Sequence, residues 1–209
     1  MHKTNFMHVT GGESTGRNVF THYLRKLIMK VRRVVLGVGS SGKSGVLSDE
    51  EARRTSVFKS VPGFEAALLW STNASNEAGS RAAFSDPTVQ ANFLPGVGES
   101  RLMFVTFPPD SVMMSEDFDG AAFGAEFGQL LPGLAETFEP DAPGMHATDS
   151  IDYDVLLEGE ITLELDDGKE VLLKKHDVAV QQGNRHAWRN KSDKPATMLF
   201  VLMGAKRAG

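Results

Sequence analysis

The sequence predicts an all-β fold, either a sandwich or a closed barrel, with one short helical insertion. Short runs of β-branched and other apolar residues recur through the second half of the chain at intervals of roughly 8 to 12 residues. Turn signals that contain Gly separate these runs. One stretch in the middle of the chain has helical spacing instead. The chain therefore lacks the regular alternation of strands and helices from which parallel sheets are built.

Four strands are expected before the helical stretch, at residues 31–38, 56–61, 64–71 and 101–107. Pro62-Gly63, a dipeptide typical of turns, separates the second from the third. The fourth ends at Pro108-Pro109. The polar residues between the third and the fourth strand have no clear period, so we interpret them as a loop with at most one short helix.

Residues 118–138 show helical periodicity. Apolar side chains recur there at i, i+4, i+7, i+8 and i+11, which predicts an amphipathic helix that ends or kinks at Pro132. These side chains belong to Phe123, Phe127, Leu130, Leu131 and Leu134. Two interpretations remain open: the helix packs on the outside of a sheet, or its aromatic residues form a lid over a pocket.

The strands after Pro143-Gly144 follow one another closely. Glu158-Gly159 separates the first two, and Asp167-Gly168 predicts a tight hairpin after the second. Apolar and polar residues alternate strictly over residues 161–166, as in a strand with one buried face. Further strands are expected at residues 177–181, 184–190 and 196–203.

Residues 37–44, GVGSSGKS, match the spacing of a phosphate-binding loop, in which backbone N–H groups hold phosphates and Lys43 would supply charge. The rest of the chain argues against nucleotide binding. Its downstream strands form hairpins, which are antiparallel, and residues 45–55 have little apolar face to pack as the required helix. We therefore interpret the segment as a Gly- and Ser-rich turn.

Charge is distributed unevenly along the chain. Residues 1–33 carry seven Lys or Arg and one acid, whereas the other 176 residues carry 15 basic and 26 acidic side chains. The acidic body argues against nucleic acid as a partner. No apolar run approaches the roughly 20 residues that span a bilayer, so no membrane contact is expected. The chain has no cysteine, which excludes disulfides, thiolate metal sites and cysteine nucleophiles.

The basic N-terminal segment has two interpretations. We expect residues 1–28 to be an extension outside the fold, with Met29 as the natural start of a cytoplasmic protein. The alternative is an organelle-targeting segment, because basic and hydroxyl residues are present there and acids are scarce.

The segment GMHATDSIDYDVLLEGE resembles the first conserved motif of the cupin superfamily. His146 and Thr148 stand at the positions of two His residues in that motif. Asp152 stands where Glu is usual, and Gly159 follows at the spacing of the motif.

The segment HDVAVQQGNRHAWRN resembles the second cupin motif. Asp177, Gly183, His186 and Asn190 match it, whereas His176 replaces a turn Gly and Gln181 stands where Pro is common. The resemblance implies a double-stranded β-helix, a jelly-roll barrel, over residues 101–205. Residues 31–100 would then supply extra N-terminal strands and a loop that pack on the barrel, and residues 1–30 a basic extension.

The resemblance also implies a metal site inside the barrel. His146, Asp152 and His186 keep two imidazoles and one carboxylate, the composition of the facial triad that holds Fe(II) with open positions. The same set would hold Mn²⁺, Ni²⁺ or Zn²⁺. Thr148 is a poor ligand, so its place is left for substrate.

Two neighbours complete the predicted site. Asp154 lies two residues from Asp152 on the same strand face, so either carboxylate or both point inward. If both do, Asp154 is the candidate catalytic general base or a partner of the ligands. Trp188 shares a face with His186 and either packs in the core or lines the pocket as a substrate contact together with Thr148.

These residues predict a metal-dependent enzyme acting on a small organic substrate. Oxygenase, decarboxylase, isomerase and lyase chemistry all remain open, because a fold does not choose among them. The alternative is a non-catalytic small-molecule binder or an accessory protein of a biosynthetic pathway, which the missing second His motivates. The resemblance further implies a homodimer formed through the added N-terminal strands.

Overall fold

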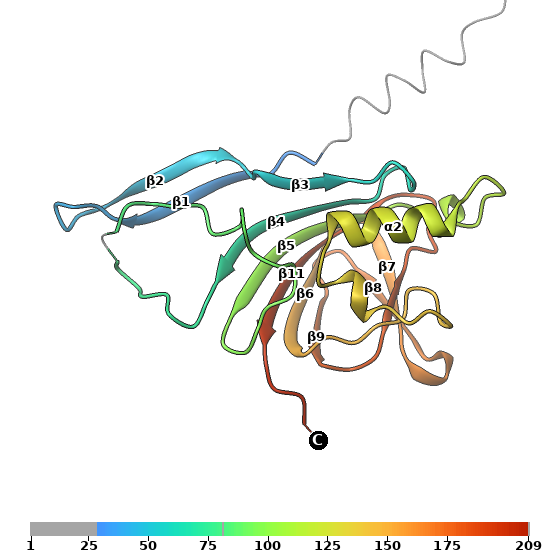
Figure 1. The fold of residues 1–209 in the computed structure, drawn as a ribbon. Coiled ribbons are helices and arrows are strands. Elements are labelled where there is room, and N and C mark those ends of the chain that lie inside the picture. The colour runs from blue at the N-terminus through green and yellow to red at the C-terminus, as the bar shows by residue number, and fades with distance from the viewer. Residues whose placement is uncertain (1–28, 81, 209) are drawn as a thin grey trace, which may run out of the picture.

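The computed structural model describes residues 29–80 and 82–208 (Figure 1). The two interpretations of the segment before Met29 therefore lie outside the described residues. Within them, no helix is both long enough and apolar enough to cross a membrane.

The described strands form three sheets, and every paired strand is antiparallel to its neighbour. A six-stranded sheet has the order β3-β4-β5-β11-β6-β9, a three-stranded sheet has the order β10-β7-β8, and β1 and β2 pair only with each other. The strands are β1 (Arg32–Val38), β2 (Ser44–Glu51), β3 (Arg54–Val57), β4 (Glu65–Thr72), β5 (Ser100–Phe107), β6 (Ser150–Glu158), β7 (Glu160–Glu164), β8 (Glu170–Lys174), β9 (Val178–Gln182), β10 (Ala187–Arg189) and β11 (Ala196–Gly204).

The two larger sheets share one hydrophobic core. Buried side chains reach it from both, among them Met103 of β5, Leu156 of β6 and Met198 of β11 on one side, and Ile161 of β7 and Leu173 of β8 on the other. Burial of this apolar area is the main favourable term in folding. The predicted all-β class and the double-stranded β-helix are confirmed.

Buried and more exposed residues alternate along β6 and β11, and this alternation determines which side chains enter the core. Every second residue of β11 is buried, from Ala196 to Leu202. On β6 the buried positions include Asp152 and Asp154, while Tyr153 between them is 46% exposed. The question left open by the sequence is settled, because both carboxylates lie on the inward face.

Residues 37–44 form the end of a hairpin rather than a phosphate-binding loop. The N–H of Gly39 bonds to the carbonyl of Lys43, and the chain returns as β2 beside β1 (Figure 1). The strand β2 was not predicted, because its sequence is polar and largely exposed and has no apolar face to reveal it.

The predicted helix is present as α2 (Gly120–Leu130) and ends two residues before Pro132. Asp119 caps it by accepting the N–H groups of Ala121 and Ala122. Phe127 is buried against Phe58 and Phe138, as expected for a helix that packs on the outside of the sheets. The short 3₁₀ turns η1 (Asp110–Val112), η2 (Ala135–Thr137) and η3 (Asp166–Gly168) complete the elements.

A buried ion pair ties the β1–β2 hairpin to the barrel. Arg33 of β1 donates to Asp86, in the loop between β4 and β5, and to the carbonyl of Leu69 on β4. Burial alone would raise the pKa of Asp86, but hydrogen bonds from Arg33 and Thr88 outweigh it and lower that pKa from 3.8 to about 2.

Gly159 allows the tight turn between β6 and β7. Its φ is +81°, and a Cβ there would lie 2.6 Å from the carbonyl oxygen of Pro195. Gly159→Ala should lower the free energy of unfolding by about 2 kcal/mol or more, through backbone strain and steric clash together. Gly168→Ala is the matched control, because Gly168 has φ +67° but open space around it and should lose only about 1 kcal/mol. Equal shifts in denaturant midpoint would contradict the steric part of this account.

The Arg33–Asp86 pair predicts an acid-sensitive contribution to stability. Because the folded pKa of Asp86 lies below its unfolded value, the contribution is present above about pH 4 and is lost as pH falls to about 2. Asp86→Asn should therefore destabilise the protein by about 2 to 4 kcal/mol at pH 7. The difference in free energy of unfolding between variant and parent, measured by urea unfolding, should become smaller as the pH falls from 4 to 2. A gap that stayed constant over that range would show that Asp86 does not titrate with folding.

Candidate functional site

His146 and His186 meet in the barrel through their own backbones. The N–H of each bonds to the carbonyl of the other at 2.9 Å, which makes an antiparallel bridge between segments about 40 residues apart in sequence. The side chains lie on the same side of this bridge, with ring centroids 4.3 Å apart. Both residues are buried. The structure therefore brings together the two His residues that the sequence singled out.

The two imidazoles are held in the same tautomer. Nδ1 of His146 lies 3.1 Å from the carbonyl of Gly144, and Nδ1 of His186 lies 3.1 Å from the carbonyl of Asn184. A carbonyl oxygen only accepts hydrogen bonds, so each Nδ1 carries the proton and each Nε2 keeps its lone pair.

Both rings are neutral near pH 7. Burial lowers the pKa of His146. Burial, and then the proximity of His146, lower the pKa of His186 to about 4.

The inward face of β6 places two carboxylates in the same interior. Burial raises the pKa of Asp152, and burial followed by the nearby Asp152 raises the pKa of Asp154 to about 8. One oxygen of each, Oδ1, is buried without a hydrogen-bond partner within the described residues. Buried polar atoms are rarely left in this way, so each Oδ1 is a position where a proton, an ion or a ligand would be stabilised.

Thr148 lies with Asp152. Its Oγ1 is 3.4 Å from Asp152 Oδ2 and accepts a hydrogen bond from Ser150 at 2.9 Å. Thr148 is thus a neighbour of the carboxylate, two residues before β6 begins.

Gln181 is a member of the site that the sequence reasoning did not include. It lies on β9 opposite Asp152, and only 3% of it is exposed. Its Nε2 is 2.8 Å from Asp154 Oδ2 and 3.1 Å from His186 Nε2, so a single amide links a carboxyl group to an imidazole. The available signal was its departure from the family motif, at a position where Pro is common.

Aromatic side chains form the wall beside the His pair. The ring of Phe138 stacks on His146 with centroids 4.4 Å apart, and Trp188 presents its edge to His186 at 5.8 Å. Phe200 of β11 packs against Trp188 in turn. Trp188 therefore contacts His186 and also packs against the core, and its role as a substrate contact stays a prediction.

The predicted ligand set is not assembled in this arrangement. Among residues 29–80 and 82–208, no three His, Asp or Glu side chains lie close enough together to hold one ion. His146 and His186 converge, whereas Asp152 does not join them as a third ligand. The metal role of these three residues stays a prediction.

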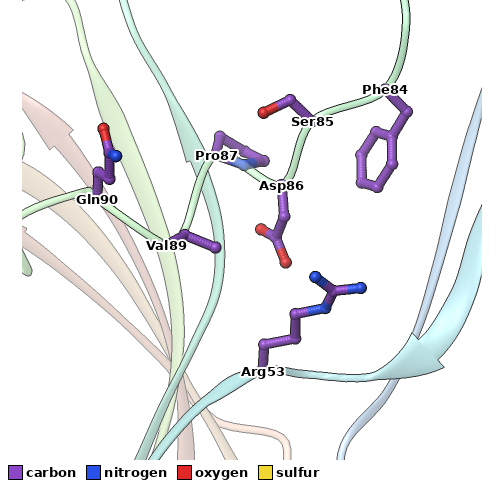
Figure 2. A pocket seen from close by; sticks show the side chains of 7 residues that line it. All are labelled: Arg53, Phe84, Ser85, Asp86, Pro87, Val89 and Gln90. Carbon is purple, nitrogen blue, oxygen red and sulfur yellow. The ribbon is translucent and has the colours of Figure 1, made fainter.

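A surface pocket lies elsewhere on the molecule, and no His side chain lines it. Its volume is about 560 Å³, and Figure 2 shows Arg53 and Asp86 pointing toward each other across it. Asp86 is already engaged by the buried Arg33, and no imidazole lines the pocket. The neutral imidazoles and the unpaired carboxylate oxygens favour the barrel interior over this pocket as the candidate site.

Part of the barrel matches a known protein family. Residues 136–202 match the family model described as a cupin domain. Over this segment the chain is similar to cupin domains. The match includes both His residues, both carboxylates and Gln181, and it leaves β1 to β5 and α2 outside.

Curated relatives match part of this chain. The chain is 54% identical over 85 residues to phomopsin biosynthesis cluster protein D of Diaporthe leptostromiformis, which covers 38% of this chain and 45% of the relative. It is 43% identical over 65 residues to oryzines biosynthesis cluster protein J of Aspergillus oryzae, covering 31% and 36%. It is 37% identical over 65 residues to a cupin-domain-containing oxidoreductase of Hypocrea virens, covering 30% and 34%. The chain thus spans less than half the length of each of these relatives.

Proposed function

We propose that this cupin domain acts as an enzyme on a small organic molecule in a biosynthetic pathway. A divalent transition metal, Fe, Mn, Ni or Zn, would be held by His146, His186 and Asp152. The observation that carries the proposal is the His pair, in which both Nδ1 atoms are anchored to backbone carbonyls, so that each Nε2 keeps a lone pair; that of His186 accepts a hydrogen bond from Gln181. Relatives named for biosynthesis clusters and as oxidoreductases support the pathway and the class of reaction.

The donor types suit such a metal, and Asp152 would have to approach the His pair to complete the set. Metal-binding His residues usually donate their other ring N–H to a carbonyl or carboxylate, which fixes the ring and its tautomer. The Oδ1 atoms of Asp152 and Asp154 are buried and unpartnered, which a cation would correct. When bound, the metal supplies Lewis-acid or redox chemistry to a substrate.

Asp154 is the proposed proton-transfer residue. Its Oδ2 accepts a hydrogen bond from Gln181, so a proton on the neutral carboxyl resides on Oδ1, which has no other partner. From there it can be donated to a substrate oxygen and later recovered. Trp188 and Thr148 are the proposed substrate contacts, and the aromatic wall of Phe138 and Trp188 keeps water away from the reacting groups.

We also propose a homodimer in which a second copy of the chain covers the outer face of β6 and β9, a different face from the N-terminal strands that the family resemblance implied. Ile151, Tyr153, Val178 and Val180 are all exposed there, and Tyr153 and Val180 are direct partners across the two strands. The patch is apolar and uncharged, so it is complementary to itself, as the symmetric contact of a homodimer requires.

The metal proposal predicts a change in composition. Protein purified without chelators and reconstituted with Mn²⁺ or Fe²⁺ should contain about one ion per chain, and His186→Ala or His146→Ala should lose most of it. Plasma mass spectrometry measures this directly. His176→Ala is the matched control, because His176 is an exposed turn residue outside the barrel interior and should leave the metal content unchanged.

Two outcomes would refute this assignment. One is metal content that survives both His substitutions. The other is parent protein that neither retains nor takes up a first-row metal and gains no stability from one, which would favour the non-catalytic small-molecule binder.

The dimer proposal is tested by placing charge in the patch. Val180→Lys should convert a dimer into a monomer in light scattering coupled to gel filtration, because a buried lysine at a symmetric contact repels its copy. Leu36→Lys is the control, since Leu36 is exposed and apolar but lies on the β1–β2 hairpin. A monomeric parent, or dissociation caused by Leu36→Lys alone, would overturn the choice of this face.

A further inference from the structure

The side-chain amide of Gln181 has a fixed orientation. Asn184 donates from Nδ2 to the Oε1 of Gln181 at 3.1 Å, so the amide oxygen faces Asn184. The amide nitrogen consequently faces inward, where its two N–H groups are directed at Asp154 Oδ2 and His186 Nε2. Donors and acceptors match at every contact, because Oδ2 and the lone pair of Nε2 can both accept.

This arrangement occupies the only free lone pair of His186. The ring uses its Nδ1–H on the carbonyl of Asn184, and its Nε2 accepts from Gln181. A metal ion bound by His186 needs that same lone pair. The two N–H groups of the amide also carry partial positive charge, which opposes a cation at this point.

The two His residues differ in this respect. His146 has the same anchor on its Nδ1, but the described residues provide no hydrogen bond to its Nε2. An ion at this position would meet a free Nε2 on His146 and, on His186, an Nε2 that already accepts a hydrogen bond from Gln181.

We infer that Gln181 is a built-in competitor for the metal position, a positioning residue whose amide must leave His186 before an ion can bind there. Its departure also frees Asp154 Oδ2, so entry of the ion releases the proposed proton-transfer carboxyl from its interior donor. This inference rests on the proposed function and adds to it: the affinity of the site for divalent cations is set by Gln181 and by the Asn184 contact that orients it.

Replacing Gln181 tests the inference with the metal alone. Gln181→Ala removes the competing donor, so Mn²⁺ or Co²⁺ should bind about tenfold more tightly in calorimetric titration, the equivalent of one or two net hydrogen bonds. Gln181→Glu replaces the amide by a carboxylate at the same place, which supplies an anionic ligand beside His186 and should tighten binding further. The bands of bound Co²⁺ in the visible spectrum give a second readout, since a change of ligands at His186 alters them.

Two further variants separate this role from a purely structural one. Gln182→Ala is the matched control, because Gln182 is the next residue on β9 and its side chain is exposed, so metal affinity should not change. Asn184→Ala removes the contact that orients the amide, together with the hydrogen bond that Asn184 Oδ1 accepts from the N–H of Gln182, and leaves the backbone carbonyl that anchors His186. It should also tighten binding, which keeps the test decisive if a Gln181 variant fails to fold.

The outcomes distinguish the inference from the function on which it rests. Folded Gln181→Ala, Gln181→Glu and Asn184→Ala proteins that bind Mn²⁺ and Co²⁺ as the parent does, or more weakly, overturn the inference. If His186→Ala still abolishes binding in that case, the metal site itself stands. If no variant and no parent protein binds either ion, both the inference and the metal site are refuted. A parent that binds weakly and a Gln181→Glu variant that binds well support both.

Discussion

The bridge between His146 and His186 is the contact on which the candidate site depends. Two backbone hydrogen bonds join segments that lie in different parts of the chain and fix the distance between the rings. The anchoring carbonyls of Gly144 and Asn184 each lie two residues before the His they hold. Ring position and tautomer are therefore set by main-chain geometry, which makes the pair insensitive to most substitutions in the surrounding wall.

The interior around this bridge is polar but largely uncharged. Four ionisable side chains are buried there, and burial displaces the pKa of each toward its neutral form. Isolated charges in such a place would cost far more than an apolar core. His186, the amide of Gln181 and Asp154 form a hydrogen-bonded set instead, while Nε2 of His146 has no hydrogen bond from the described residues.

Local chemistry made much of the fold predictable. Strict alternation placed Asp152 and Asp154 on one face of a strand and Tyr153 on the other, as the structure has them. The Asp167-Gly168 pair predicted the hairpin, and both residues have positive φ there. Contacts between distant segments were not predictable in this way. The hydrogen bonds of Gln181 depend on Asn184, Asp154 and His186 at once, and the pairing of Arg33 with Asp86 depends on a loop with no period. Strand β2 was not predicted because a hairpin that is exposed on most of its surface needs no alternation of apolar and polar residues.

The ion pair of Arg33 and Asp86 couples the stability of the protruding β1–β2 hairpin to that of the barrel. Arg33 lies on the hairpin, whereas Asp86 belongs to the loop between β4 and β5 and the carbonyl of Leu69 belongs to β4. Proteolytic trimming of the hairpin would remove the cation and leave a carboxylate buried in the long loop before β5. The hairpin is consequently a poor place to shorten the chain, although it looks like the most dispensable part of the surface.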